Sequence, residues 1–160
     1  MANARLGNGR QNTRLESEGA EFLVLGNLLV EGIDAYKSYR YMQGYDVVAV
    51  LPDKQSIAKI QVKSRWASDA NGFLIRNYDC DFVVFVALNR GFRYKNRLNR
   101  KKWNEGRSQP ECYVFPTQLV RRHRDKKSKW GRVVPRHIPS YKDYKENWEL
   151  IRAFLNKQKS

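Results

Sequence analysis

One uninterrupted apolar segment limits the folds that this chain can adopt. Residues 82–88 (Phe-Val-Val-Phe-Val-Ala-Leu) have no polar side chain and are rich in β-branched and aromatic residues, a pattern typical of a strand covered on both faces. Such a strand needs helices above and below its sheet. This longest apolar run is also far too short to cross a membrane. We therefore expect an α/β fold, a central mixed β-sheet flanked by helices, with residues 82–88 as its central strand and no membrane partner.

Further helices and strands are expected around this segment. Proline is absent from Leu15 to Glu31, apolar residues occupy most of the helical circumference, and Gly32 follows as a stop signal. This stretch predicts a helix that is buried against the sheet on most sides. Ser140 and Asp143 resemble a capping box and begin an apolar stripe at helical spacing. The remaining signals predict a C-terminal helix over 140–156, a short helix over 116–122, and strands over 33–40, 45–51, 56–64, 72–76 and 112–115.

The length of the chain suits one domain. We expect its 160 residues to form a single domain over 1–160, with a flexible arm over 1–14 and a basic region over 90–136. The N-terminus lacks the apolar segment of a secretory signal, which favours a cytoplasmic protein. Cys80 and Cys112 belong to no C-x-x-C pair, so we expect two buried apolar side chains and no zinc site.

Positive charge is concentrated in one part of the sequence. The net charge is +15, and the segment 90–136 holds 16 basic residues against three acidic ones, which supplies +13 of that total. Aromatic residues such as Phe92, Tyr94 and Trp130 alternate with these cations, a pattern typical of nucleic-acid binding. The side chains expected to bind nucleic acid are Arg65, Arg93, Lys95, Arg97, Arg100, Lys101, Lys102, Arg121, Arg122, Arg124, Lys126, Lys127 and Lys129.

A predicted hairpin brings three polar side chains together. A four-residue turn after Leu51 pairs that residue with Ser56, and the same register places Asp46 opposite Gln61. Lys63 lies two residues further along, on the same face of the strand. Carboxylate and amide oxygens are ligands that Mg²⁺ or Mn²⁺ accepts, and an adjacent lysine can stabilise charge on a phosphate. The hairpin is therefore a candidate site for metal-assisted phosphodiester hydrolysis.

Two sequence segments carry a family resemblance. Residues 44–48 (Gly-Tyr-Asp-Val-Val) and 60–65 (Ile-Gln-Val-Lys-Ser-Arg), preceded by a helix with a carboxylate, resemble the PD-(D/E)XK nuclease superfamily over roughly residues 15–90. The Gln-x-Lys variant is similar to intron-encoded homing endonucleases and small Holliday-junction-resolvase-like nucleases. The resemblance implies a restriction-endonuclease-like core. It also implies metal binding by Glu21, Asp46 and Gln61, and a catalytic site of Glu21, Asp46, Gln61 and Lys63.

The match departs from the family pattern at two positions. Tyr45 stands where the family name expects proline, and Gln61 replaces an acidic residue, which keeps an oxygen ligand but removes a negative charge. The helix carboxylate has two candidates, Glu21 and Glu18, which lie three residues apart on one helix face. The apolar neighbours of Glu21 favour it.

These features lead to one main functional expectation and three alternatives. The main expectation is a Mg²⁺-dependent or Mn²⁺-dependent endodeoxyribonuclease that hydrolyses DNA, in particular a site-specific enzyme of the homing type. The alternatives are a Holliday-junction or branched-DNA resolvase, a non-catalytic DNA-binding remnant of a nuclease, and an RNA-binding basic protein. One small domain cuts two strands most simply as a homo-oligomer, a dimer or higher.

Overall fold

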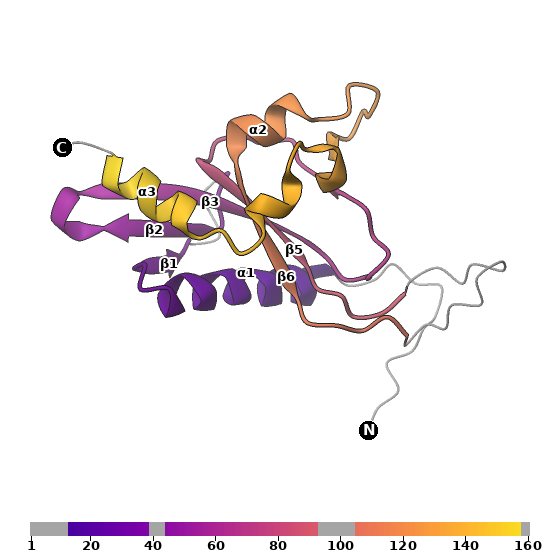
Figure 1. The fold of residues 1–160 in the computed structure, drawn as a ribbon, viewed down its shortest axis with the longest axis horizontal. Helices are drawn as coiled ribbons and strands as arrows, with labels where there is room; N and C mark the ends of the chain where they lie inside the picture. Colours follow the sequence, from indigo (N-terminus) through magenta and orange to yellow (C-terminus); the bar gives the residue numbers. More distant parts are fainter. Residues whose placement is uncertain (1–12, 39–43, 93–104, 158–160) are drawn as a thin grey trace.

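The computed structural model describes residues 13–38, 44–92 and 105–157, which form a five-stranded sheet with helices on both faces (Figure 1). In chain order, the helices and strands are α1 (Thr13–Val30), β1 (Ala35–Lys37), β2 (Val47–Leu51), β3 (Ser56–Arg65), β4 (Phe73–Leu74), β5 (Phe82–Ala87), β6 (Glu111–Pro116), α2 (Thr117–Arg122), β7 (Arg132–Val133) and α3 (Glu149–Lys157). Three short 3₁₀ turns accompany them, η1 (Pro52–Lys54), η2 (Pro135–His137) and η3 (Tyr141–Tyr144).

The main sheet is mixed, as the sequence predicts. Its strand order is β1-β2-β3-β5-β6, with β3 and β5 parallel and every other neighbouring pair antiparallel. The segment around Phe82 is an interior strand, paired on both edges and buried on both faces. The middle position in the strand order belongs to β3, however, so the expectation that residues 82–88 form the central strand is wrong by one place. Strands β4 and β7 form a separate two-stranded ribbon.

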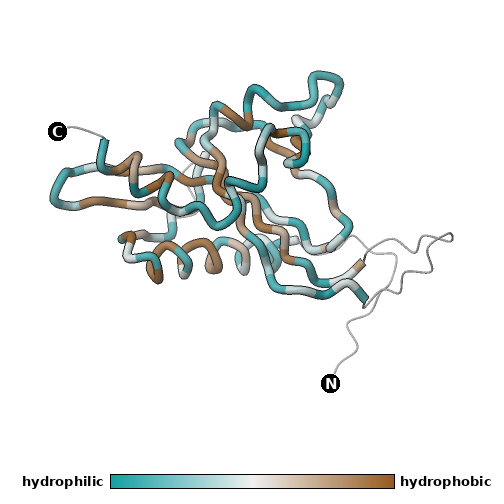
Figure 2. Tube along the Cα trace, in the orientation of Figure 1, coloured by the Kyte–Doolittle hydropathy of each residue, from teal (hydrophilic) through white to brown (hydrophobic). Residues whose placement is uncertain are grey.

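Two hydrophobic cores lie on opposite faces of the sheet. On one face, α1 and α3 pack against alternate residues of the strands, including Ile60 and Val84. On the other face, Val83 and Phe85 pack with α2, β4, β7 and the 3₁₀ turns. The central strands are mainly hydrophobic, whereas the turn after α2 is hydrophilic (Figure 2). The burial of both faces explains why the sequence of β5 contains no polar residue.

The first helix is less buried than the sequence predicts. It begins at Thr13, inside the stretch expected to be an arm, and ends before Gly32, whose φ of +71° suits the predicted stop. Its buried residues are Ala20, Val24 and Leu28, all on one face. The opposite face is exposed to solvent, so the expectation of burial on most sides is wrong. The expected arm over residues 1–12 lies outside the described residues.

The C-terminal helix is shorter than the sequence predicts. A continuous helix over 140–156 is wrong: residues 141–144 form a 3₁₀ turn, Ser140 makes no capping hydrogen bond, and α3 begins only at Glu149. Glu146 interrupts the helix because its N–H donates to the carbonyl of Cys112 (2.8 Å) while its carboxylate accepts from the N–H of Cys112 (2.7 Å). This anchor to β6 lets the chain cross the sheet edge. Tyr141 therefore packs in one core and Trp148 in the other.

Two smaller expectations concern cysteine and the membrane. Cys112 is buried and burial raises the pKa of its thiol to about 12, whereas Cys80 is only half-buried. Among the described residues, no helix is long and apolar enough to span a bilayer.

Candidate active site

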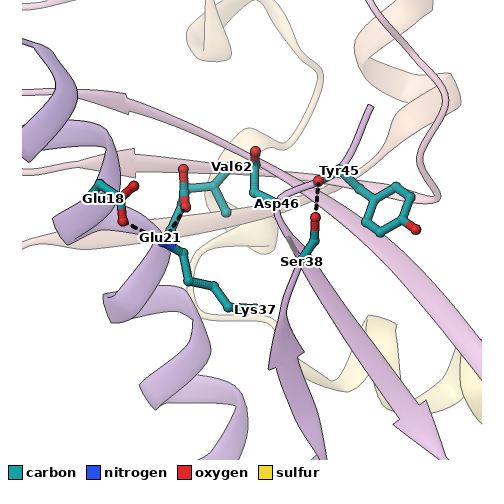
Figure 3. Close-up of polar contacts among 7 residues, drawn as sticks. All are labelled: Glu18, Glu21, Lys37, Ser38, Tyr45, Asp46 and Val62. Atoms are coloured by element: carbon teal, nitrogen blue, oxygen red, sulfur yellow. Dashed lines mark hydrogen bonds and ion pairs between the residues drawn. The ribbon is translucent and has the colours of Figure 1, made fainter. Parts of the chain in front are cut away.

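The candidate site lies where β1, β2 and β3 meet α1 (Figure 3). The predicted hairpin register is present, with Leu51 paired to Ser56. Asp46 directly precedes β2, and its N–H donates to the carbonyl of Ile60 (2.8 Å). Its carboxylate Oδ2 accepts a hydrogen bond from the N–H of Val62 (2.7 Å). These two bonds bracket Gln61, so strand pairing fixes Asp46 opposite that residue.

The approach to Asp46 depends on a glycine. Gly44 has a φ of +99°, and a Cβ atom at this position would lie 3.0 Å from the backbone oxygen of Asp79. Any other residue at this position would be strained, because its backbone would have to adopt a positive φ and its Cβ atom would crowd Asp79. On the other side, Ser38 donates from its Oγ to the carbonyl of Tyr45 (3.1 Å) and from its N–H to the carbonyl of Asp46 (2.9 Å). The entry to β2 is thus held from both sides.

Gln61 carries an unusual polar group. Its side chain is buried on β3, with 8% of its surface exposed, and its Oε1 atom accepts no hydrogen bond. Leaving a buried acceptor without a partner costs about 1 to 3 kcal/mol. Native structures keep few such atoms, and each one calls for a physical explanation such as a bound ion or water. Within the candidate site, the Oε1 atom of Gln61 is therefore the group that a bound ion or water molecule would satisfy.

Lys63 lies two residues further along β3, on the same face of the strand as Gln61. It is half-buried, and within the described part of the chain its ammonium group forms no ion pair with a carboxylate. Its charge reaches Asp46, whose pKa it lowers. A half-buried lysine whose ammonium group is not paired with a carboxylate can stabilise negative charge on a bound phosphate.

The helix side of the site contains a residue that the sequence analysis missed. Lys37, at the end of β1, donates a hydrogen bond to Glu18 and lies 3.0 Å from the carboxylate of Glu21 (Figure 3). Its Nζ also lies 4.6 Å from the centre of the Phe22 ring. The only sequence signal was a lysine within the strand predicted over 33–40, because the contact between β1 and α1 joins segments far apart in the chain.

The carboxylates respond to burial in the same direction. Burial raises the pKa of Asp46, and the Val62 N–H bond and the charge of Lys63 offset this only in part. Burial also raises the pKa of Glu21, against the hydrogen bond from Lys37 and together with the negative charge of Asp46. The negative charge of Asp46 acts on Glu21, the helix carboxylate that the sequence analysis favoured over Glu18.

The chemistry of these donors fits a hard divalent cation. Asp46 and Glu21 offer carboxylate oxygens, and the unpartnered Oε1 of Gln61 offers a third oxygen of the kind that Mg²⁺ and Mn²⁺ prefer. No cluster of three or more His, Cys, Asp or Glu that could hold a metal occurs among the described residues. Mg²⁺ or Mn²⁺ held by carboxylate and amide oxygens of this kind would complete its coordination with water.

The structure places only part of the predicted basic surface. Residues 93–102, which include Arg93, Lys95, Arg97, Arg100, Lys101 and Lys102, lie outside the described residues. Arg65 is used internally, because its Nε donates to the carbonyl of Gly72 (2.7 Å). Six predicted cations lie on α2 and the following turn, and all six are exposed, namely Arg121, Arg122, Arg124, Lys126, Lys127 and Lys129.

An aromatic side chain accompanies these cations. Trp130 is 62% exposed, and the guanidinium carbon of Arg76 lies 4.6 Å from its ring centre. Arg76 follows strand β4, and the sequence analysis did not select it. The pair presents a flat cationic surface beside the exposed lysines of the turn, which suits contacts with nucleic-acid backbones and bases.

Comparison with solved structures shows that the fold is similar to that of an endonuclease. No family model matches the sequence, and no curated protein matches it either. Among solved structures, the fold is similar to that of a nuclease, and the protein concerned is a bacterial homing endonuclease, I-Ssp6803I. The two structures align with a TM-score of 0.53 over 92% of this chain and 94% of that chain, at 23% sequence identity. The chain thus has an α+β fold similar to that of a homing endonuclease, over nearly the whole of both proteins.

Proposed function

We propose that this chain is a DNA endonuclease that hydrolyses phosphodiester bonds with Mg²⁺ or Mn²⁺, of the PD-(D/E)XK type and with a homing endonuclease as its structural neighbour. The observation that carries the proposal is the buried, unpartnered Oε1 of Gln61 opposite the carboxylate of Asp46, with Lys63 on the same strand. A nuclease of this class needs an oxygen-lined metal site beside a cation that stabilises the transition state. These three residues supply both requirements.

The residues would divide the chemistry as follows. Asp46, Gln61 and Glu21 would hold the cation, which when bound acidifies a water molecule and neutralises charge on the phosphate. Lys63 orients that water and stabilises the charge that develops on phosphorus-bound oxygen. The water oxygen forms a bond to phosphorus while one P–O ester bond breaks. One fragment keeps the phosphate, and the other leaves with a hydroxyl group that takes up a proton.

The exposed cations suit the substrate. Arg121, Arg122 and Arg124 on and after α2, with Trp130 and its partner Arg76, can neutralise backbone phosphates and lie against bases. The solved protein with the similar fold is a homing endonuclease, which favours DNA over RNA as the substrate of this chain. We infer that a homo-oligomer carries out cleavage of both strands, because one chain provides one site.

A second candidate is a DNA-binding remnant without catalytic activity. It is favoured by two observations: Gln61 has lost the charge of an acidic ligand, and Lys37 already neutralises the carboxylate of Glu21. Both would weaken the hold on a cation. Such a protein would bind DNA in a salt-dependent manner and would not require metal.

The test is strand scission with a matched lysine variant. Supercoiled and branched DNA are incubated with wild-type, Lys63→Met and Lys59→Met protein, in Mg²⁺, in Mn²⁺ and in EDTA. Lys59 lies on the same strand and face, but its ammonium group already contacts Asp79 (4.0 Å) and the ring of Tyr45 (5.4 Å). We expect nicking or cleavage that needs metal, survives in Lys59→Met, and falls by about 10²-fold to 10³-fold in Lys63→Met.

Other results would change the assignment. Equal retardation of DNA by all three proteins without scission, on substrates that include random-sequence libraries, would support the DNA-binding remnant. Preferential cutting of four-way junctions over linear duplexes would identify a resolvase instead of a homing-type enzyme.

A further inference from the structure

A pocket separate from the candidate active site opens at one end of the sheet. Its volume is about 520 Å³, which lies within the range that small-molecule sites occupy in proteins. It forms where the start of β5 and the end of β6 meet α2 and α3, two helices that pack on opposite faces of the sheet. Its lining includes none of Asp46, Gln61 and Lys63. We call it the α2–α3 pocket.

Part of the lining of the α2–α3 pocket is apolar and aromatic. The ring of Phe154 on α3 lies edge-on to the ring of Phe82 at the start of β5, with the two ring centres 5.3 Å apart. Leu150 and Ala153 add aliphatic surface from α3, and Pro116 adds it from the end of β6. A lining of this composition favours a flat apolar group, such as an aromatic ring.

Two cations reach the pocket from different helices. Arg121 belongs to α2 and Lys157 ends α3, and both line the pocket. Neither forms an ion pair with a carboxylate among the described residues. The lining has one acidic residue, Asp81, whose Oδ2 atom accepts a hydrogen bond from the N–H of Lys59 (2.7 Å). Two cations against one carboxylate give the pocket a positive charge, which favours an anionic ligand.

A tyrosine in the lining has a hydroxyl group without a partner. The Oη atom of Tyr78 is buried and forms no hydrogen bond within the described part of the chain. Burial raises the pKa of its phenol, and the charges of Arg124 and Arg121 offset this only in part, so the hydroxyl keeps its proton at neutral pH. A buried polar group of this kind calls for a physical explanation such as a bound water, ion or ligand.

We propose that the α2–α3 pocket binds a nucleoside monophosphate, with the base against the apolar lining and the phosphate held by Arg121 and Lys157. A nucleotide combines the flat ring and the anionic group that this lining favours. The guanidinium carbon of Arg121 lies 5.9 Å from the centre of the Tyr78 ring. Because Arg121 is exposed, it can turn toward the phosphate and open space beside that ring, where the Tyr78 hydroxyl would donate to the ligand.

The first test is the binding of 2′-deoxyadenosine 5′-monophosphate (dAMP) to the full chain, without metal, by isothermal titration calorimetry. We expect one site per chain with a Kd of roughly 10–100 µM, as a ligand of this size gives. Deoxyadenosine and inorganic phosphate should each bind at least about tenfold more weakly, because each lacks one of the two groups that the lining favours.

Matched variants test the lining. Arg121→Met should weaken dAMP binding by about tenfold, whereas Arg122→Met, at an exposed position on the same helix outside the lining, should bind dAMP as tightly as wild type. Ala153→Trp should abolish binding because it fills the pocket. Tyr78→Phe removes only the unpartnered hydroxyl, so it should weaken dAMP binding by about fivefold and leave the ligand-free protein at least as stable in urea.

Competition against bound dAMP separates the two sources of the same chemistry, a free nucleotide and the terminal nucleotide of a DNA strand. A short 5′-phosphorylated oligonucleotide that displaces dAMP better than its unphosphorylated form would identify a strand terminus as the ligand. Displacement by neither form would identify a free nucleotide. Equal displacement by both forms would contradict a pocket that binds the phosphate.

Three results would overturn the proposal. Wild-type protein that binds no dAMP would remove its basis. Equal losses in Arg121→Met and Arg122→Met would indicate a general attraction to the basic surface. Binding that persists in Ala153→Trp, folded by circular dichroism, would place the nucleotide elsewhere. Neither metal nor DNA cleavage is part of these measurements, so failure here is distinguishable from failure of the proposed function.

Discussion

The two sides of the candidate site differ in what they still lack. On the sheet side, the Oε1 atom of Gln61 is buried without a partner, and the ammonium group of Lys63 has no carboxylate partner among the described residues. On the helix side, Lys37 already binds the carboxylates of Glu18 and Glu21. The sheet side thus has polar groups without partners among the described residues, whereas the carboxylates of the helix side are already paired with the ammonium group of Lys37.

This difference teaches which residues are arranged for a ligand. An unpartnered buried oxygen lowers stability, so its presence indicates a function that needs it. An ion pair such as that of Lys37, by contrast, satisfies its carboxylates within the chain. We therefore expect the sheet side to determine whether a cation binds, and the helix side to modulate how tightly.

The largest expected effect separates the two sides by their carboxylates. Asp46→Asn should lower the cleavage rate by at least about 100-fold, because it removes the charge nearest the unpartnered oxygen. Glu21→Gln should lower it by roughly tenfold, and Glu18→Gln should leave it nearly unchanged. Single-turnover cleavage of a plasmid measures all three rates. Equal losses in the first two variants would show that the two sides contribute alike.

Restoring a negative charge on β3 should strengthen metal binding. Gln61→Glu adds a carboxylate where the amide oxygen is unpartnered, and we expect the Kd for Mn²⁺ to fall by roughly tenfold. Isothermal titration calorimetry of the DNA-free protein measures this directly. Unchanged or weaker affinity would place the cation away from β3.

Removing the buried charge of Asp46 should stabilise the fold at neutral pH. Burial raises the pKa of Asp46 above its ordinary value of 3.8, so between the unfolded and folded pKa values the folded state binds more protons. Stability from this group therefore falls as the pH rises through that interval. Asp46→Asn should raise the free energy of unfolding at pH 7 by on the order of 1 kcal/mol, with the gain disappearing below pH 3.8. Urea unfolding at several pH values measures the difference, and a loss of stability at pH 7 would contradict it.

The smallest expected effect concerns Lys37. Lys37→Met removes the cation from Glu18 and Glu21, and the affinity for Mn²⁺ should rise by about threefold as Glu21 becomes available. The stability change should be below about 1 kcal/mol, since the pair is partly exposed. The matched control is Lys145→Met, which breaks an ion pair with Glu111 away from the site and should leave metal affinity unchanged. Weaker metal binding in Lys37→Met would mean that Lys37 positions Glu21 for the cation.

Local patterns in the sequence predicted most of the sheet and the hairpin side of the site. The turn after Leu51 and the alternation along β3 are short-range features, so the register that sets Asp46 opposite Gln61 could be counted from the sequence. The apolar run at residues 82–88 indicated an interior strand for the same reason. Its place in the strand order depends on which edges pair, and the sequence does not record that directly.

Features that depend on contacts between distant segments were missed. The contact of Lys37 with α1 requires β1 to lie beside that helix, and the break at Glu146 requires its bonds to Cys112 on β6. Helical spacing alone favoured a continuous C-terminal helix, because the spacing of apolar residues contains no information about the hydrogen bonds between Glu146 and Cys112. The exposed apolar residues of α1, such as Phe22 and Leu29, were expected to be buried for a related reason, since helical spacing does not tell which faces of a helix the rest of the chain covers.

The most direct test of the account is Mn²⁺ binding to DNA-free wild-type and Gln61→Leu protein, followed by electron paramagnetic resonance. If the unpartnered oxygen of Gln61 is a metal ligand, wild-type protein binds one Mn²⁺ per chain, and Gln61→Leu, folded by circular dichroism, loses that binding. Equal binding by the two proteins, or none by wild type, would contradict the central claim that the hairpin of β2 and β3 forms a divalent metal site.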